Sequence, residues 1–106
     1  MKPSAFEYFT PFTVPEAVEL LQRHGDEAKI LAGGQSLVPM MNFRVARPRA
    51  LVDINGIKEL DYIREEKDEL VIGGLVRERT LEVSPLVQKK CPILAEAISY
   101  IGHLPI

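Results

Sequence analysis

Two adjacent glycines, Gly33 and Gly34, are the residues whose type and spacing point most directly to chemistry. They follow the apolar run Ala28–Leu31 and precede Gln35-Ser36-Leu37. Glycine allows positive φ and lets bare backbone approach a ligand, and successive N–H groups in such a turn can converge on an anion. If Ser36 begins a helix, the partial positive charge of its N-terminus adds to that attraction. The expected ligand is a phosphate or pyrophosphate.

The same glycines also suit an ordinary turn after a strand, since Gly-Gly is a frequent turn sequence. The segment matches neither the dinucleotide fingerprint G-x-G-x-x-G nor the P-loop G-x-x-x-x-G-K-[ST]. Local chemistry therefore leaves both interpretations open, and it does not name the ligand.

Composition limits the classes of function. The chain has 106 residues, of which 46% are hydrophobic and 26% charged, which suits one small globular domain or part of a larger one. A net charge of −2 argues against nucleic acid as the main partner. Cys91 is the single cysteine, so an internal disulfide or a cysteine-cluster metal site is excluded. With no signal-peptide core and no apolar run long enough to span a membrane, we expect a cytoplasmic location.

The chain carries no recognisable bond-breaking constellation. It lacks the G-x-S-x-G, H-E-x-x-H and EF-hand patterns, and His24 and His103 lie far apart in sequence. We therefore expect no catalytic residue and no metal ligand here. Any catalysis would depend on the chemistry of a bound cofactor.

Local signals predict a βαβ arrangement in the first half of the chain. Thr13 is typical of a helix N-cap, with Pro15 in the first turn and Gly25 after the last. In chain order we expect an extended segment 6–12 with Phe6, Tyr8 and Phe12 as core anchors, a helix from Thr13, a buried strand 29–31, a short helix 36–43, a strand 50–54 and a turn at Asn55-Gly56.

The second half predicts the start of an antiparallel sheet followed by helices. In chain order we expect a helical turn 57–60, a hairpin of strands 61–66 and 69–73 around Lys67-Asp68, a helix capped by Thr80, a helix from Ser84-Pro85 to Lys90, and a helix 92–101 ended by Gly102. The fold class is therefore α+β, with an α/β subdomain in residues 1–55 and an incomplete second subdomain, a β-hairpin plus helices, in residues 56–106. The apolar, uncapped end after Gly102 leads us to expect that the sequence continues in its parent.

The segment Leu31–Asn42 closely resembles the first flavin-binding motif of the FAD-binding medium subunit of molybdenum hydroxylases, the group that includes aerobic carbon monoxide dehydrogenase and xanthine dehydrogenase. The likeness covers essentially the whole chain. It continues through Phe6-Glu7-Tyr8, Thr13-Val14-Pro15-Glu16-Ala17, Leu51-Val52-Asp53-Ile54-Asn55, Ile72-Gly73-Gly74-Leu75, Arg79-Thr80-Leu81-Glu82 and Cys91-Pro92-Ile93-Leu94-Ala95-Glu96-Ala97.

The resemblance implies a vanillyl-alcohol-oxidase-type FAD-binding domain. In that family the first motif offers backbone amides to the FAD pyrophosphate, a role that falls here on Ala32, Gly33, Gly34, Gln35 and Ser36, while Leu31 and Leu37 would line the site. It also implies a large molybdopterin subunit and a small 2Fe-2S subunit as partners. Electrons would pass from the molybdenum cofactor through the iron–sulfur clusters and FAD to an acceptor.

Two departures from the family pattern matter. A second motif, Thr-Ile-Gly-Gly, normally follows the segment that resembles Ile101-Gly102-His103, and this sequence stops at Ile106; Val76 stands where the family often has threonine. We therefore expect a truncated domain in which FAD binds weakly or not at all.

Two alternatives stay open. One is a non-catalytic assembly module that associates with itself or a partner through exposed apolar surface. The other is a different flavin enzyme of the same fold, which Pro39-Met40-Met41-Asn42 disfavours because that run resembles the medium-subunit pattern.

Overall fold

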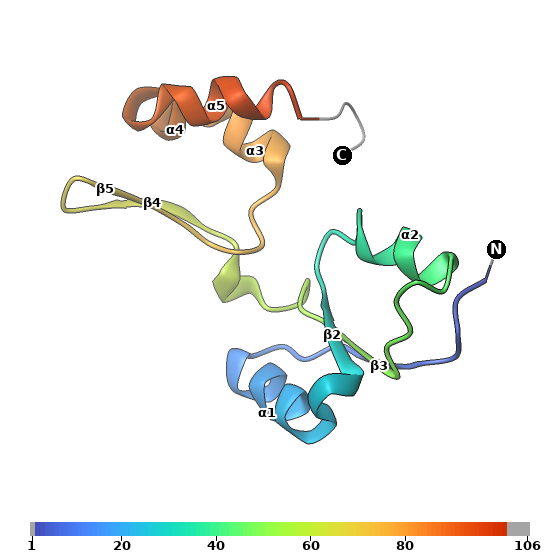
Figure 1. The fold of residues 1–106 in the computed structure, drawn as a ribbon. Coiled ribbons are helices and arrows are strands. Elements are labelled where there is room, and N and C mark those ends of the chain that lie inside the picture. Colours follow the sequence, from blue (N-terminus) through green and yellow to red (C-terminus); the bar gives the residue numbers. More distant parts are fainter. Residues whose placement is uncertain (1, 102–106) are drawn as a thin grey trace. The chain divides into compact units, whose positions relative to one another are not determined.

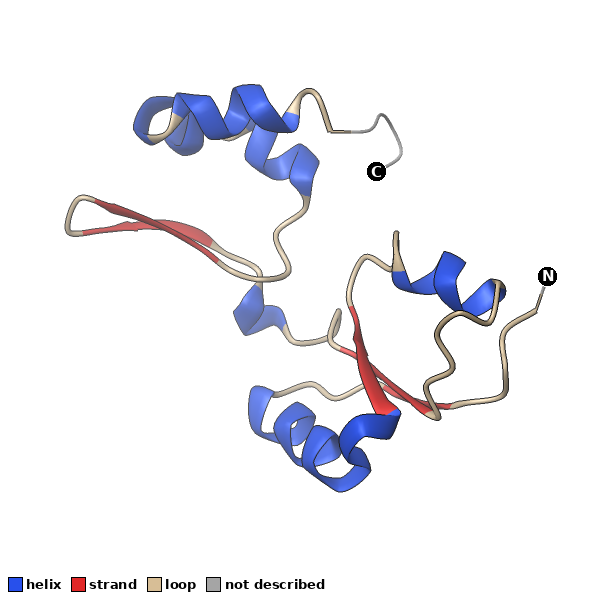
Figure 2. Ribbon diagram, in the orientation of Figure 1, coloured by secondary structure: helices blue, strands red, loops and turns tan. Residues whose placement is uncertain are grey.

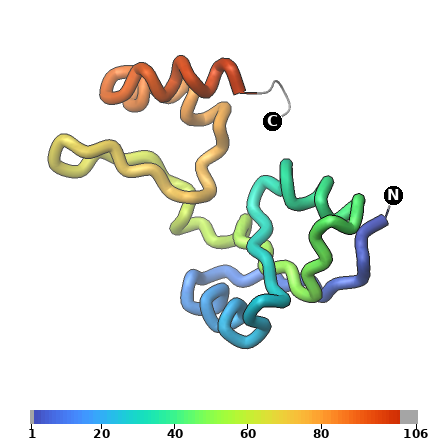
Figure 3. Tube along the Cα trace, viewed as in Figure 1, coloured from blue at the N-terminus to red at the C-terminus, as the bar shows by residue number. Residues whose placement is uncertain are grey.

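The computed structural model describes residues 2–101, and the chain divides into two compact units. We call Met1–Lys58 the N-terminal unit and Glu59–Ile106 the C-terminal unit. Figure 3 traces the first from blue to green and the second from yellow to red. The subdomain boundary expected after residue 55 remains a prediction, because compactness alone does not show where a chain folds independently.

The N-terminal unit is a parallel three-stranded sheet in the order β1-β3-β2 (Figures 1 and 2). Tyr8 of β1 lies opposite Leu51, and Leu31 of β2 lies opposite Asp53. Helix α1 packs against β2 and β3, and the parallel βαβ arrangement predicted from the sequence is confirmed. Its elements are β1 (Glu7–Phe9), α1 (Val14–His24), a short 3-10 helix (Gly25–Glu27), β2 (Ala28–Leu31), α2 (Leu37–Asn42) and β3 (Ala50–Asp53).

The core of this unit is built around the central strand. Ala50, Leu51 and Val52 of β3 are all buried, as expected for a continuous apolar run in a parallel strand with a neighbour on each side. Ala17 of α1 and Met41 of α2 are buried as well. The central strand β3 is therefore fixed by packing along its first three residues.

The prediction that Phe6, Tyr8 and Phe12 anchor the core is wrong. Their side chains are 38%, 54% and 71% exposed. They lie on or beside β1, an edge strand that is paired on one side only. The same geometry corrects the predicted burial of the second strand, since Ile30 of edge strand β2 is 50% exposed. An aromatic or β-branched residue fits a strand without being buried by it.

The N-terminus of α1 carries a side-chain cap, as predicted. The Thr13 Oγ1 accepts a hydrogen bond from the Glu16 N–H at 3.2 Å, and the Phe12 N–H donates to Glu16 Oε2 at 3.5 Å. Two amides at the helix start are thus satisfied by side chains, an arrangement related to the capping box.

Replacing the cap should destabilise the N-terminal unit. Thr13→Ala removes the acceptor for the Glu16 amide, so we expect a loss of about 1 kcal/mol in the free energy of unfolding. Urea titration followed by circular dichroism measures it. Thr13→Ser keeps the hydroxyl and should restore most of the loss; an equal loss in both variants would contradict the assignment of the cap.

The C-terminal unit consists of a β-hairpin and three short helices (Figure 1). Lys67 and Asp68 connect the strands with φ of 48° and 54°, the positive values of a type I′ turn, which confirms the predicted hairpin. The 3-10 helix Lys58–Leu60 lies at the division between the units. The other elements are β4 (Ile63–Glu66), β5 (Glu69–Ile72), α3 (Glu78–Val83), α4 (Pro85–Lys90) and α5 (Pro92–Ile98).

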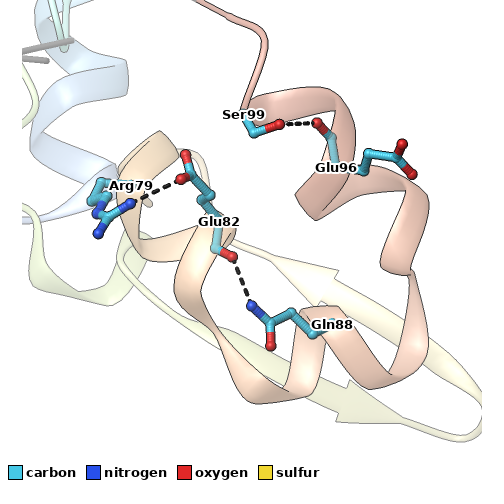
Figure 4. A network of polar contacts seen from close by, with 5 residues as sticks. All are labelled: Arg79, Glu82, Gln88, Glu96 and Ser99. Carbon is cyan, nitrogen blue, oxygen red and sulfur yellow. Dashed lines mark hydrogen bonds and ion pairs between the residues drawn. The ribbon is translucent and has the colours of Figure 1, made fainter. Parts of the chain in front are cut away.

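The three helices pack on one another, and Val87 of α4 and Ala95 and Ile98 of α5 are buried. Figure 4 shows the polar contact that joins α3 to α4, in which the Glu82 backbone carbonyl accepts from Gln88 Nε2 at 3.1 Å. Within α3, the Glu82 carboxylate pairs with Arg79 at 2.8 Å. No helix within residues 2–101 is both long enough and apolar enough to cross a membrane.

Two predicted helix ends in this unit are corrected. Thr80 is not an N-cap, because α3 already begins at Glu78: Arg77 has the extended backbone of a cap, and its carbonyl accepts from the Leu81 N–H at 3.1 Å. Helix α5 ends at Ile98 rather than Ile101. The predicted stop at Gly102 lies outside the described residues. The predicted helix from Ser84-Pro85 to Lys90 is confirmed, and the Ser84 Oγ caps it by accepting from the Val87 N–H at 3.3 Å.

Candidate anion-binding site

The candidate site lies where β2 and β3 end. Parallel strands bring their carboxyl ends to one edge of the sheet, and ligands of α/β domains commonly bind there. The turn 32–36 leaves β2 at this edge and leads into α2. The Gly34 carbonyl accepts from the Val38 N–H at 3.0 Å and the Ser36 carbonyl from the Met40 N–H at 3.1 Å. The sheet and the first turn of α2 therefore hold this segment at both ends.

Gly34 is required by the fold of the turn. Its φ is +76°, a value that side-chain-bearing residues rarely adopt. A Cβ at this position would also lie 3.0 Å from Val38 Cγ2 and 3.2 Å from Leu31 Cδ1. Both backbone conformation and packing thus disfavour a side chain at Gly34.

Gly33 is different, because a Cβ there would meet nothing within 4 Å. Its φ is outside the positive range, so neither space nor conformation within the chain demands glycine. An unfilled approach to bare backbone is the feature that a ligand requires.

The turn also presents unused donors. Among the hydrogen bonds of residues 2–101, none has the N–H of Gly33, Gly34, Gln35 or Ser36 as its donor. The segment 31–37 contains no acidic side chain to repel an anion. Neighbouring N–H groups without an acceptor are the kind of donors that can bind an anion.

The seven residues predicted for the site occupy one continuous segment. Leu31 is the last residue of β2 and Leu37 the first of α2, and both are half-buried at the two ends of the turn. Ser36 is the N-cap of α2, but its side chain makes no capping hydrogen bond.

A polar network next to the turn escaped the sequence prediction. Asp53 Oδ2 accepts from the Tyr8 hydroxyl, while Asp53 Oδ1 accepts from the Asn55 backbone N–H at 3.0 Å and from Asn55 Nδ2 at 2.7 Å. Asn55 Nδ2 also donates to the Ala32 carbonyl at 2.8 Å. The network thus joins the ends of β1 and β3 to the start of the turn. Its sequence signal was a pair of polar residues at the end of a buried strand, with Asp53 as the last residue of β3 and Asn55 two positions later.

The network contains the Asp53 carboxylate, and both of its oxygens accept hydrogen bonds. The hydrogen bond to Asp53 is the main cause that raises the pKa of Tyr8 above its ordinary value of 10, with desolvation and the carboxylate's charge adding to it. The Tyr8 hydroxyl therefore stays protonated throughout the neutral pH range and continues to donate its hydrogen bond to the Asp53 carboxylate.

A hollow in the N-terminal unit lies away from the turn. A hollow of about 680 Å³ is lined by Ser4, Ala5, Phe6, Glu7, Arg47 and Arg49. It lies at the opposite edge of the sheet from the turn, because Glu7 and Ala50 begin β1 and β3. In the part of the chain that the structure describes, no group of three His, Cys, Asp or Glu side chains is placed to hold a metal ion.

Comparisons with known proteins show the family of this chain. Residues 4–106 match a family described as the FAD binding domain in molybdopterin dehydrogenase. The chain is 52% identical over 102 residues to the carbon monoxide dehydrogenase medium chain of Hydrogenophaga pseudoflava, covering 96% of this chain and 36% of that protein. It is 43% identical over 106 residues to the caffeine dehydrogenase subunit beta of Pseudomonas sp. strain CBB1, covering 100% of this chain and 36% of that protein.

The fold is shared with solved structures. Carbon monoxide dehydrogenase from Hydrogenophaga pseudoflava that lacks the Mo-pyranopterin moiety superposes with a TM-score of 0.96 at 51% identity, over 98% of this chain and 36% of that chain. The chain thus spans about a third of the length of the relatives it matches. The match along nearly all of its residues shows that the chain belongs to the family of FAD-binding domains of molybdopterin dehydrogenases.

Proposed function

We propose that this chain binds the pyrophosphate of FAD at the turn between β2 and α2. The observation that carries the proposal is the open backbone at Gly33, next to amides that donate to no other group among the described residues. A pyrophosphate offers several acceptor oxygens, and N–H groups bind such oxygens at about 2.9 Å. Among compounds that contain a pyrophosphate, membership in this family supports FAD as the ligand.

Each residue of the turn has a separate role in this proposal. The amides of Ala32, Gly33, Gly34, Gln35 and Ser36 would hold the pyrophosphate. Leu31 and Leu37, half-buried at either end of the turn, would line the site with apolar surface. None of these side chains can exchange a proton at neutral pH, so the chain supplies binding, and FAD supplies the redox chemistry when it is bound.

At the level of the whole assembly, we infer an electron-transfer subunit of a molybdenum hydroxylase complex. The relatives are named as subunits or chains of dehydrogenases, which supports membership in a multi-subunit oxidoreductase. The partners would be a large molybdopterin subunit and a small 2Fe-2S subunit. FAD would receive electrons from the iron–sulfur clusters and deliver them to an acceptor.

A role in assembly is supported by a separate observation. Apolar side chains on α2 and directly after it are exposed, with Phe43 at 63% and Val45 at 75%, and Val38 and Met40 are partly exposed on the helix itself. Apolar surface of this kind commonly contacts another chain. This exposed apolar surface would let the chain contact another subunit of a complex, whether or not the chain binds FAD by itself.

The binding proposal is tested by titrating the ¹⁵N-labelled chain with FAD, ADP and riboflavin. We expect FAD and ADP to shift the amide resonances of residues 32–36, with a dissociation constant on the order of 1 mM, equivalent to about −4 kcal/mol. Weak binding is expected because the turn supplies only one group of pyrophosphate contacts. Riboflavin, which has no phosphate, should leave these resonances in place. Equal shifts with riboflavin, or none with FAD, would count against the pyrophosphate site.

A further inference from the structure

We propose that Asn55 is a positioning residue for the pyrophosphate turn: its side-chain amide holds the Ala32 carbonyl and thereby orients the Gly33 N–H. This inference rests on the proposed function and assigns a role to a residue outside the turn. Asn55 lies 23 positions from Ala32 in sequence, yet its Nδ2 is 2.8 Å from the Ala32 carbonyl oxygen.

The orientation of the Asn55 amide follows from its neighbours. Nδ2 lies 2.8 Å from the Ala32 carbonyl oxygen and 2.7 Å from Asp53 Oδ1, and both of these oxygens can only accept. The NH₂ group has two hydrogens, one for each acceptor. The opposite orientation would place the side-chain oxygen between two other oxygens. The contacts therefore determine which end of the amide faces the turn.

The other partners hold Asn55 in place. Asp53 Oδ1 accepts from both the backbone N–H and the side chain of Asn55, and Asp53 Oδ2 accepts from the Tyr8 hydroxyl. Asp53 ends β3, which is buried along its preceding three residues. The Asn55 amide is thus fixed to the end of the most buried strand of the unit rather than to another loop.

Because the peptide unit is planar, fixing the Ala32 carbonyl also fixes the direction of the Gly33 N–H. The carbonyl of residue 32 and the N–H of residue 33 belong to one peptide unit, and in a trans peptide they point in opposite directions. When Asn55 holds the Ala32 carbonyl, the Gly33 N–H must point away from Asn55. There it has no acceptor among residues 2–101, and it stays available to a phosphate oxygen. Such preorganisation lowers the entropic cost of binding.

The test compares Asn55→Ala and Asn55→Asp with Gln22→Ala, an exposed position on α1. Asn55→Asp keeps the shape but places a carboxylate oxygen opposite the two acceptors. ¹⁵N relaxation should give the Gly33 amide of the parent chain an order parameter near that of rigid backbone, about 0.85, and a value below about 0.6 in both Asn55 variants. FAD affinity should fall about tenfold, with Gln22→Ala unchanged in both measurements.

The outcomes separate the positioning role from the proposed function. An unchanged order parameter in the Asn55 variants overturns the inference, and so does a loosened turn that binds FAD as well as the parent. A third outcome is that the Gly33 order parameter falls only in the Asn55 variants, while FAD shifts no amide resonance of the parent chain. In that case the hydrogen bond from Asn55 to Ala32 is supported and the FAD proposal fails. A through-hydrogen-bond coupling between Asn55 Nδ2 and the Ala32 carbonyl carbon tests the contact in the parent chain, whether or not the variants fold; its absence overturns the inference.

Discussion

Replacing Gly73 with alanine should unfold the hairpin region of the C-terminal unit. A Cβ at Gly73 would lie 2.2 Å from the Leu60 carbonyl oxygen and 2.8 Å from its carbonyl carbon. These atoms are backbone, so they cannot move aside as a flexible side chain can. The Leu60 carbonyl also accepts from the Leu75 N–H at 3.0 Å, and the Gly73 N–H donates to the Tyr62 carbonyl at 2.9 Å. Relieving the clash would break this pairing, and we expect a loss of about 3 kcal/mol or more.

The neighbouring glycine provides the matched control. A Cβ at Gly74 would meet nothing within 4 Å, and its φ is not positive, so Gly74→Ala should change stability by less than about 1 kcal/mol. Hydrogen exchange of the amides in β4 and β5 reports on this unit by itself. Gly73→Ala should lose their protection while Gly74→Ala keeps it. Similar protection in the two variants would show that the backbone at Leu60 does not lie against Gly73.

Replacing Gly33 with valine should weaken FAD binding at least tenfold and leave the fold intact. The side chain would extend into space where nothing of the chain lies within 4 Å of its Cβ, so the stability change should stay within about 1 kcal/mol. It would also occupy the approach to the amides of the turn, where a phosphate oxygen must come to about 2.9 Å. We therefore expect a loss of affinity of at least tenfold, measured by the same FAD titration.

Gly34→Ala is the companion variant, and we expect its main effect on stability rather than on the approach of the ligand. Its Cβ would lie 3.0 Å from Val38 Cγ2, and the native φ of +76° would be strained, so we expect the turn itself to lose about 1–3 kcal/mol of stability. Comparing the two variants separates a glycine needed by the ligand from one needed by the fold. If the Gly33→Val variant binds FAD like the parent, the ligand does not approach the turn over Gly33.

Features that depend on a few neighbouring residues could be predicted from the sequence. The cap at Thr13 and the helix start at Ser84 could be predicted because a cap is a contact with an amide three positions ahead. The Lys67-Asp68 turn followed from two adjacent strand-like runs in the same way. The location of the glycine turn was predictable for the same reason, since it directly follows the short strand β2.

Features set by the arrangement of strands could not be predicted in this way. The exposure of Tyr8 follows from the position of β1 at the edge of the sheet, which no local pattern specifies. The bonds from Tyr8 to Asp53 and from Asn55 to Ala32 join positions 45 and 23 residues apart. They exist because the parallel order β1-β3-β2 brings the ends of all three strands to one edge. The error at Thr80 was local in origin: a good capping residue lay one turn inside a helix that Arg77 had already begun.

Gly33 and Gly34 are constrained differently, and this difference predicts how the two positions would change during evolution. Gly34 is fixed by conformation and packing, whereas Gly33 has open space around it. In a lineage that kept this domain as scaffold after losing its flavin, selection would still hold the second glycine and release the first. A side chain at the position of Gly33, beside a retained glycine at the position of Gly34, would therefore mark a descendant that inherited the architecture without the cofactor.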